Sequence, residues 1–211
     1  MKNILAPLLT ILLFMAIMGI QGCEMPVRKV ESPVSFYKSG EYNNSNVQRV
    51  LLIPFTYETG REKVVKEVTE AFFVELQKNA KYDIVVPHEF HEAFLKQDDL
   101  WVKGLVRPET IIEAKKRYQV DAIMFGTITR YKPYEPPVLG IKMSMFSTTS
   151  GNVIWNSDTI FDSSEATITK LAKIYYKENF QEKQSLYGWK LILLSSERYA
   201  QFVAHHIVAT L

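Results

Sequence analysis

Cysteine is nearly absent from this chain of 211 residues, because Cys23 is the only one. A single cysteine excludes a disulfide within one copy of the chain, although secreted proteins often use disulfides. A strong net charge is missing too, since the chain has 25 basic and 23 acidic residues. Proteins that bind nucleic acid carry a basic surface, so this balance disfavours nucleic acid as a partner.

The motifs of familiar enzyme sites are also missing. The chain has no Gly-x-Ser-x-Gly turn, no phosphate-binding glycine loop and no carboxylate pair at a recognisable spacing. His88 and His91 are one residue too close for the zinc motif His-Glu-x-x-His, so we expect a solvated helix face there. His205 and His206 are adjacent, about 100° apart on a helix, and are expected at the core edge and the surface. The sequence therefore predicts no catalytic residue, no metal and no cofactor.

The first feature that is present is an apolar leader. Residues 1–22 carry one charge, on Lys2, and an aliphatic run extends from Ile4 to Ile20. This pattern is typical of a secretory signal peptide. An uncleaved membrane anchor is the alternative, although the run is slightly short of the roughly 20 apolar residues that cross a bilayer.

The end of this leader, Ile-Gln-Gly-Cys, resembles the bacterial lipobox, in which a small residue precedes a cysteine that receives a diacylglycerol. The resemblance implies cleavage after Gly22 and lipidation at Cys23. Several acyl chains anchor a protein stably, so the mature chain would be held at a membrane surface. Glu24 stands where an Asp is associated with retention in the inner membrane, which favours the outer membrane, facing the periplasm.

Three parts follow from these boundaries: a signal peptide over 1–22, an acylated tether over 23–46 and a single domain over 47–211. The tether is rich in Ser, Asn, Pro and Lys and shows no apolar periodicity. Loss of Lys2 with the leader leaves 24 basic against 23 acidic residues, so the mature chain is close to neutral. The length of the remainder suits one domain with a sizeable core.

Apolar patterning predicts an α/β fold for this domain. Residues 50–53 are apolar on consecutive positions and Pro54 ends the run, as in a central strand covered on both faces. An amphipathic helix over 62–78 follows, and further strands are expected over 82–86 and 121–130. Connections of this strand, helix and strand type make parallel pairs.

The second half of the chain changes to antiparallel patterning. Apolar residues alternate over 139–145 and return over 153–161, which predicts a hairpin. Further helices are expected from Pro87, from Pro108, over 164–177 and over 195–211. The predicted fold class is α/β, a mixed sheet with parallel strands from β-α-β units followed by an antiparallel hairpin, with helices packed on the sheet.

One segment, 173–194, contains too many aromatic residues for an ordinary solvated loop. Aromatic side chains with a polar group are favoured at protein interfaces and at the level of membrane headgroups. Packing beneath the closing helix, as part of the core, is the alternative. The candidate interface residues are Tyr175, Tyr176, Phe180, Tyr187 and Trp189, with Trp189 as the best single anchor.

Three motifs in order carry a family resemblance: 50–55 (Val-Leu-Leu-Ile-Pro-Phe), 120–128 around Gly126, and 150–155 (Ser-Gly-Asn-Val-Ile-Trp). Together with the lipobox they resemble the CsgG, LpoB and PelC type of periplasmic lipoprotein over residues 47–161. The resemblance implies an α/β fold similar to the TolB amino-terminal and anticodon-binding domains. CsgG needs two long lipid-facing hairpins per subunit, whereas this chain has one clear hairpin, which disfavours a pore made by this chain alone.

The resemblance implies a non-enzymatic outer-membrane lipoprotein that serves as an oligomeric assembly or interaction module in envelope biogenesis or export, as PelC does. An LpoB-like regulator that docks on a peptidoglycan synthase is the alternative. The expected partners are the membrane, through the lipid, further copies of the chain, and an envelope protein that the sequence does not identify. The short tether favours a role close to the membrane.

Overall fold

The computed structural model describes residues 30–58, 61–79, 81–86, 108–180 and 186–211. The chain divides into a unit of Met1–Val30 and a unit of Glu31–Leu211, and the fold described below is that of the second unit. The leader, Gly22, Cys23, and the helix predicted from Pro87 with His88 and His91 lie outside the described residues. Among the described residues, none of the helices has the length and apolar character needed to span a bilayer.

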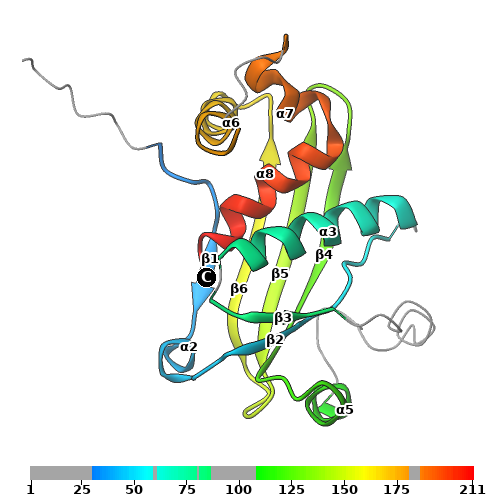
Figure 1. Ribbon diagram of the computed structural model, residues 1–211, viewed down its shortest axis with the longest axis vertical. Coiled ribbons are helices and arrows are strands. Elements are labelled where there is room, and N and C mark those ends of the chain that lie inside the picture. The colour runs from blue at the N-terminus through cyan, green and yellow to red at the C-terminus, as the bar shows by residue number, and fades with distance from the viewer. Residues whose placement is uncertain (1–29, 59–60, 80, 87–107, 181–185) are drawn as a thin grey trace, which may run out of the picture. The chain divides into compact units, whose positions relative to one another are not determined.

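A six-stranded mixed sheet forms the centre of this unit, with strand order β1-β6-β5-β4-β2-β3 (Figure 1). Strand β2 runs parallel to β3 and β4, and the remaining neighbours are antiparallel. The predicted α/β class, with parallel strands followed by an antiparallel hairpin, is confirmed. The strands are β1 (Phe36–Lys38), β2 (Arg49–Leu52), β3 (Asp83–Val85), β4 (Ala122–Lys132), β5 (Val138–Ser147) and β6 (Val153–Asp162).

Helices cover both faces of the parallel part of the sheet. The helical elements are α2 (Gly40–Asn44), α3 (Glu62–Lys78), α5 (Pro108–Tyr118), α6 (Ala166–Asn179), the short 3-10 helix η2 (Gly188–Lys190), α7 (Leu191–Leu194) and α8 (Ser196–Val208). Figure 1 shows α3 and α8 side by side across one face, and the two helices contact each other. Ile111 of α5 instead joins the core cluster of Leu51 and Ile53. Because successive strand residues point to opposite faces, Leu52 faces the α3 and α8 side.

Gly126 allows an aromatic ring to lie directly on the sheet. A Cβ atom at this position would lie 2.2 Å from Cε1 of Phe55, closer than packed atoms approach. The Phe55 ring in turn contacts Phe72 of α3 at a centroid distance of 4.7 Å, and both side chains are fully buried. The absence of a side chain at Gly126 therefore serves the packing of Phe55.

The predicted tether is too long, because its last part belongs to the fold. Strand β1 pairs with β6, and the Tyr42 side chain of α2 is buried. Ser39 caps α2 by accepting a hydrogen bond from the Tyr42 N–H. A strand of three residues leaves little periodicity to detect, so composition alone places these residues in the tether.

We predict that Gly126→Ala destabilises the domain by about 1 to 3 kcal/mol, because the new methyl group must displace the Phe55 ring from a filled core. Chemical unfolding followed by circular dichroism measures this loss. Gly40→Ala is the matched control, since nothing lies within 4 Å of a Cβ atom there. Equal stability of the two variants would contradict the packing role of Gly126.

Candidate functional site

The aromatic segment of the sequence forms one end of the domain, made by residues 173–180 and 186–194 and called the aromatic end below. Helix α6 places Ile168, Leu171, Ala172 and Tyr175 on its buried side. This spacing of three and four residues is that of an amphipathic helix packed on a core. Within the described residues η2 and α7 lead into α8, and Figure 1 shows α6 and α7 at the same end of the sheet.

Tyr175 is a core residue in this structure rather than an exposed contact. Its side chain is 3% exposed, and its ring contacts Phe202 at 5.6 Å and His205 at 5.0 Å between centroids. Burial raises the pKa of the Tyr175 hydroxyl well above its usual value. The core alternative for the segment therefore holds at this position, because Tyr175 lies on the α6 face that meets α8.

The neighbouring candidates are only partly buried and pack on one another. The Tyr176 and Phe180 rings stack at 5.3 Å, and the Arg198 guanidinium lies 5.1 Å from the centre of the Phe180 ring. The Lys173 ammonium lies 4.7 Å from the centre of the Trp189 ring. Cation and aromatic pairs of this kind contribute about 0.5 to 1 kcal/mol at exposed sites. These contacts order the segment without removing it from the surface.

Large apolar side chains protrude from the aromatic end. Leu186 is 99% exposed, Tyr187 61% and Leu194 51%, and Ile174 of α6 is 38% exposed. An isolated exposed apolar residue is common on proteins, but a group on one segment marks a contact surface. Tyr187 and Trp189 thus lie where the sequence analysis places an interface, and their function as an interface remains a prediction.

Glu75 is a buried carboxylate that contacts His205 and Lys78, a cluster that the sequence does not predict. The Glu75 carboxylate is 3% exposed, lies 2.6 Å from Nζ of Lys78 and lies 3.2 Å from Nδ1 of His205. Burial alone would raise the pKa of Glu75, but hydrogen bonds and charge from His205 and Lys78 hold it below its usual value. The three side chains join α3 to α8 and so have a structural role.

His206 lies between aromatic rings at the core edge. Its ring is 5.9 Å from that of Phe161 and 4.9 Å from that of Phe202, between centroids. Nε2 of His206 is buried without a hydrogen-bond partner among the described residues. Burial, and to a smaller extent the charge of His205, lowers the pKa of His206 to about 4, so the imidazole is neutral at pH 7.

A second polar cluster closes the fold near Leu211, and the sequence analysis missed it. The Tyr42 hydroxyl donates to the Leu211 carbonyl oxygen and lies 2.7 Å from the Tyr82 hydroxyl. Lys81 Nζ donates to the same carbonyl oxygen at 2.7 Å, and Lys38 Nζ does so at 3.3 Å. Burial raises the pKa of Tyr82. Tyr42 in the predicted tether was the sequence signal for this cluster, since aromatic residues are uncommon in solvated tethers.

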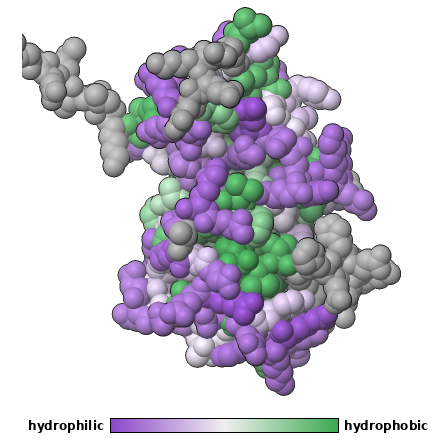
Figure 2. Space-filling view, in the orientation of Figure 1, coloured by the Kyte–Doolittle hydropathy of each residue, from purple (hydrophilic) through white to green (hydrophobic). Residues whose placement is uncertain are grey.

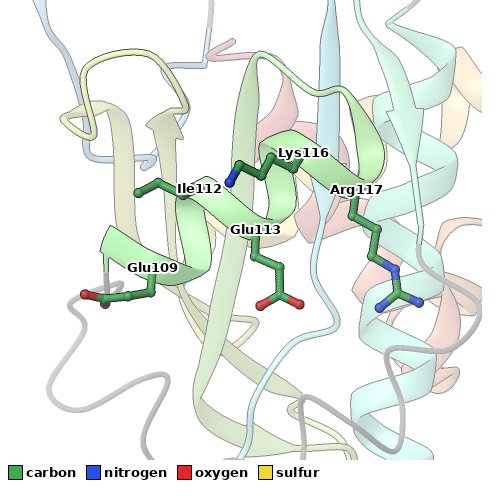
Figure 3. A pocket seen from close by; sticks show the side chains of 5 residues that line it. All are labelled: Glu109, Ile112, Glu113, Lys116 and Arg117. Atoms are coloured by element: carbon green, nitrogen blue, oxygen red, sulfur yellow. The ribbon is translucent and has the colours of Figure 1, made fainter.

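Two surface hollows accompany these clusters. One, of about 470 Å³, is lined among the described residues by Glu109, Ile112, Glu113, Lys116 and Arg117 of α5, whose side chains spread along the helix in Figure 3. The other, of about 350 Å³, is lined by Glu41, Asn44, Ser45, Asn46, Val47, Asp121, Ser147 and Thr149. Within the described ranges, no three His, Cys, Asp or Glu side chains gather as a metal site would require.

Comparison with known proteins gives a likeness of fold. No protein-family model matches the chain, and no curated protein is similar to it in sequence. Among solved structures, the PelC dodecamer from Paraburkholderia phytofirmans is 12% identical, with a TM-score of 0.42, over 65% of this chain and 86% of that one. Lipoprotein GNA1162 from Neisseria meningitidis is 17% identical, with a TM-score of 0.42, over 64% and 99%.

The LpoB C-terminal domain from Salmonella enterica is also similar, with 16% identity and a TM-score of 0.41 over 57% of this chain and 87% of that one. PelC and LpoB are two of the proteins that the sequence motifs indicate. At such identities the likeness describes the course of the chain and not its activity.

We predict that acid destabilises the domain through His206. The unfolded chain binds a proton at this residue below a pH of about 6.5, whereas the folded chain binds it only below about 4. Stability from the neutral imidazole is therefore complete above pH 6.5 and falls as the pH drops toward 4, by about 3 kcal/mol in all. Unfolding measured across this range should show the loss in the wild type and not in His206→Phe.

His205→Gln is the control, because it removes the neighbouring imidazole and leaves His206 in its aromatic setting. This variant should keep the loss of stability between pH 6.5 and 4. An identical pH profile for the wild type and His206→Phe would show that His206 is not held neutral by burial.

We also predict that Trp189→Ala leaves the domain folded at a cost of about 1 kcal/mol, since its partly exposed ring has Lys173 as its cation partner. Tyr175→Ala should cost about 3 kcal/mol or more, because it opens a cavity in the core. Chemical unfolding of both variants measures the difference. If Trp189→Ala unfolds the domain, the aromatic end is core and the contact surface lies elsewhere.

Proposed function

We propose that this chain is a lipid-anchored protein of the bacterial outer membrane, facing the periplasm, whose α/β domain is a non-enzymatic assembly or interaction module in envelope biogenesis or export. The observation that carries the proposal is the position of Cys23, the only cysteine, directly after a leader of signal-peptide type. Disulfide formation within the chain is impossible, so acylation gives this residue a chemical role.

The polar clusters of the domain support a binding role rather than catalysis. The Glu75 carboxylate contacts His205 and Lys78 between two helices, and the Asp121 carboxylate accepts hydrogen bonds from the N–H groups of Gln48 and Arg49 at 3.0 Å. Each carboxylate is engaged in holding backbone or helices in place. A catalytic acid or base instead needs a free face toward a substrate.

The fold also bears on the LpoB-like alternative, a regulator that reaches a peptidoglycan synthase on a long tether. Since Phe36 already pairs in the sheet, only Glu24–Ser35 is left to connect the lipid to the domain. These dozen residues span at most ~40 Å when fully extended, and much less as a coil. So short a connection favours a partner or a second copy close to the membrane.

We predict that Cys23→Ala releases the protein from membranes without unfolding the domain, because the acylated thiol is the proposed anchor and lies outside the folded unit. Fractionation of cells with metabolic acyl labelling measures both effects, and circular dichroism of the released protein checks the fold. Cys23→Ser is a matched control that should behave in the same way. Wild type that takes no acyl label, with Cys23→Ala still bound to membranes, would contradict the lipoprotein assignment.

The released Cys23→Ala protein also tests assembly. If the domain is an assembly module, sedimentation velocity should show species larger than the monomer as the concentration rises. A monomer at every accessible concentration would contradict self-association while leaving the lipid anchor intact.

A further inference from the structure

The path of the chain just before β1 fixes the end of the sheet at which these residues leave it. The Ser35 N–H donates to Oγ1 of Thr159 at 3.1 Å, and the Asp158 N–H donates to the Ser35 carbonyl oxygen at 3.3 Å. Because β1 is antiparallel to β6, residues before Phe36 run toward the carboxyl end of β6, where α6 follows. In Figure 1 the blue stretch before β1 leads toward α6. The tether therefore leaves the sheet on the side of the aromatic end.

Exposed apolar side chains gather at this same end. Leu186, Tyr187 and Leu194 belong to the aromatic end and are more than half exposed. Tyr134, 79% exposed, lies in the connection between β4 and β5, which the pairing of Val138 with Asp162 places at the carboxyl end of β6. Figure 2 shows hydrophobic side chains on the surface at the α6 and α7 end.

Charge at the aromatic end suits an anionic surface. The described residues of the aromatic end include three basic residues, Lys173, Lys177 and Lys190, and one acidic residue, Glu178. The chain as a whole has nearly equal numbers of basic and acidic residues. Lysines beside tyrosine, tryptophan and leucine form the composition found at the headgroup level of membranes. A lysine near an anionic membrane surface is attracted to it, and screening limits this attraction to about one Debye length.

The opposite end of the sheet has a different character. It carries the second hollow, where Asn44, Asn46 and Thr149 lie beside the Glu41 and Asp121 carboxylates. Carboxylates in this position disfavour contact with anionic lipid. This hollow is therefore polar and lined by two carboxylates, and Lys115 of α5 reaches its edge through Thr149 at 3.3 Å.

We propose that the aromatic end lies against the phospholipid surface of the membrane that holds Cys23, with Leu186, Tyr187 and Leu194 at the headgroup level. This orientation rests on the proposed lipid anchor. The domain would thus be docked by protein contacts as well as tethered, and its end with the hollow of Glu41 and Asp121 would face away from the membrane, available to a partner.

The test uses the acylated protein in vesicles of roughly three parts phosphatidylethanolamine to one part phosphatidylglycerol, an anionic mixture. Because Cys23 is acylated, an introduced cysteine is the only free thiol and takes a fluorescent label. Leu194→Cys and Leu186→Cys report on the proposed contact. Ile112→Cys on α5 is the matched control, since Ile112 is 53% exposed and Leu194 51%.

Nitroxide lipids labelled at the headgroup should quench the fluorophore at 186 and 194 about five-fold more than at 112, as expected for side chains at the interface. Iodide in the water should quench in the opposite order. Equal quenching by the nitroxide at all three positions would overturn the proposal. Protection at 186 and 194 from both quenchers, with cross-linking between copies, would also overturn it, because the surface would then be a subunit interface.

Failure of this orientation is distinguishable from failure of the lipid anchor. Acyl labelling of the vesicle-bound protein is measured in the same preparation. A labelled protein without selective quenching retains its anchor and loses the docking surface. A protein that takes no acyl label contradicts the anchor itself, and with it the orientation that rests on the anchor.

Discussion

Burial of the β2 strand on both faces is the constraint on which the rest of this domain depends. Val50, Leu51 and Leu52 are fully buried, and the strand lies between β3 and β4 in parallel pairing. A parallel sheet with no polar face needs helices on both sides, and its crossovers supply them. Helix α5 therefore packs over Leu51, while α3 and α8 occupy the other face.

The close contact between Phe55 and Gly126 follows from this constraint. The chain leaves β2 through Pro54, and the Phe55 ring then fills the space between the sheet and Phe72 of α3. A side chain at position 126 would force α3 outward, and α8, which packs on α3, would have to move with it. One missing Cβ atom thereby sets the distance between two layers.

Much of the sheet could be predicted from the sequence because its signals are local. Consecutive apolar residues predicted β2 and β4, and alternation over 139–145 predicted β5, with β6 expected as its return strand. The burial pattern of β6 shows one buried face over most of its length. Strand β1 could not be found in this way. It is three residues long, and its pairing with β6 connects residues more than a hundred positions apart, so its stability comes from the partner strand.

In the aromatic segment, local sequence patterns do not predict which side chains are buried. Tyr175 and Tyr176 are adjacent on α6, and the helix turns one toward Phe202 and leaves the other near the surface. Because both residues are tyrosines, the residue type cannot tell which one is buried. Only the packing of α8 against α6 determines that Tyr175 is the core residue. The polar cluster of Tyr42, Tyr82 and Leu211 could not be predicted from local patterns either, because its members are far apart in the sequence and meet only in the folded chain.

The antiparallel pairing of β1 with β6 also bears on the proposed orientation of the domain. A short edge strand contributes little stability by itself. It does set the direction in which the preceding residues leave the sheet, since Ser35 lies against Asp158 and Thr159. If β1 ran parallel to β6, the same residues would leave near the hollow of Glu41 and Asp121, and a lipid on Cys23 would draw carboxylates toward anionic headgroups. The observed direction leads toward the end with lysine and aromatic side chains instead, so under the proposed lipid anchor this short pairing would determine which surface meets the membrane.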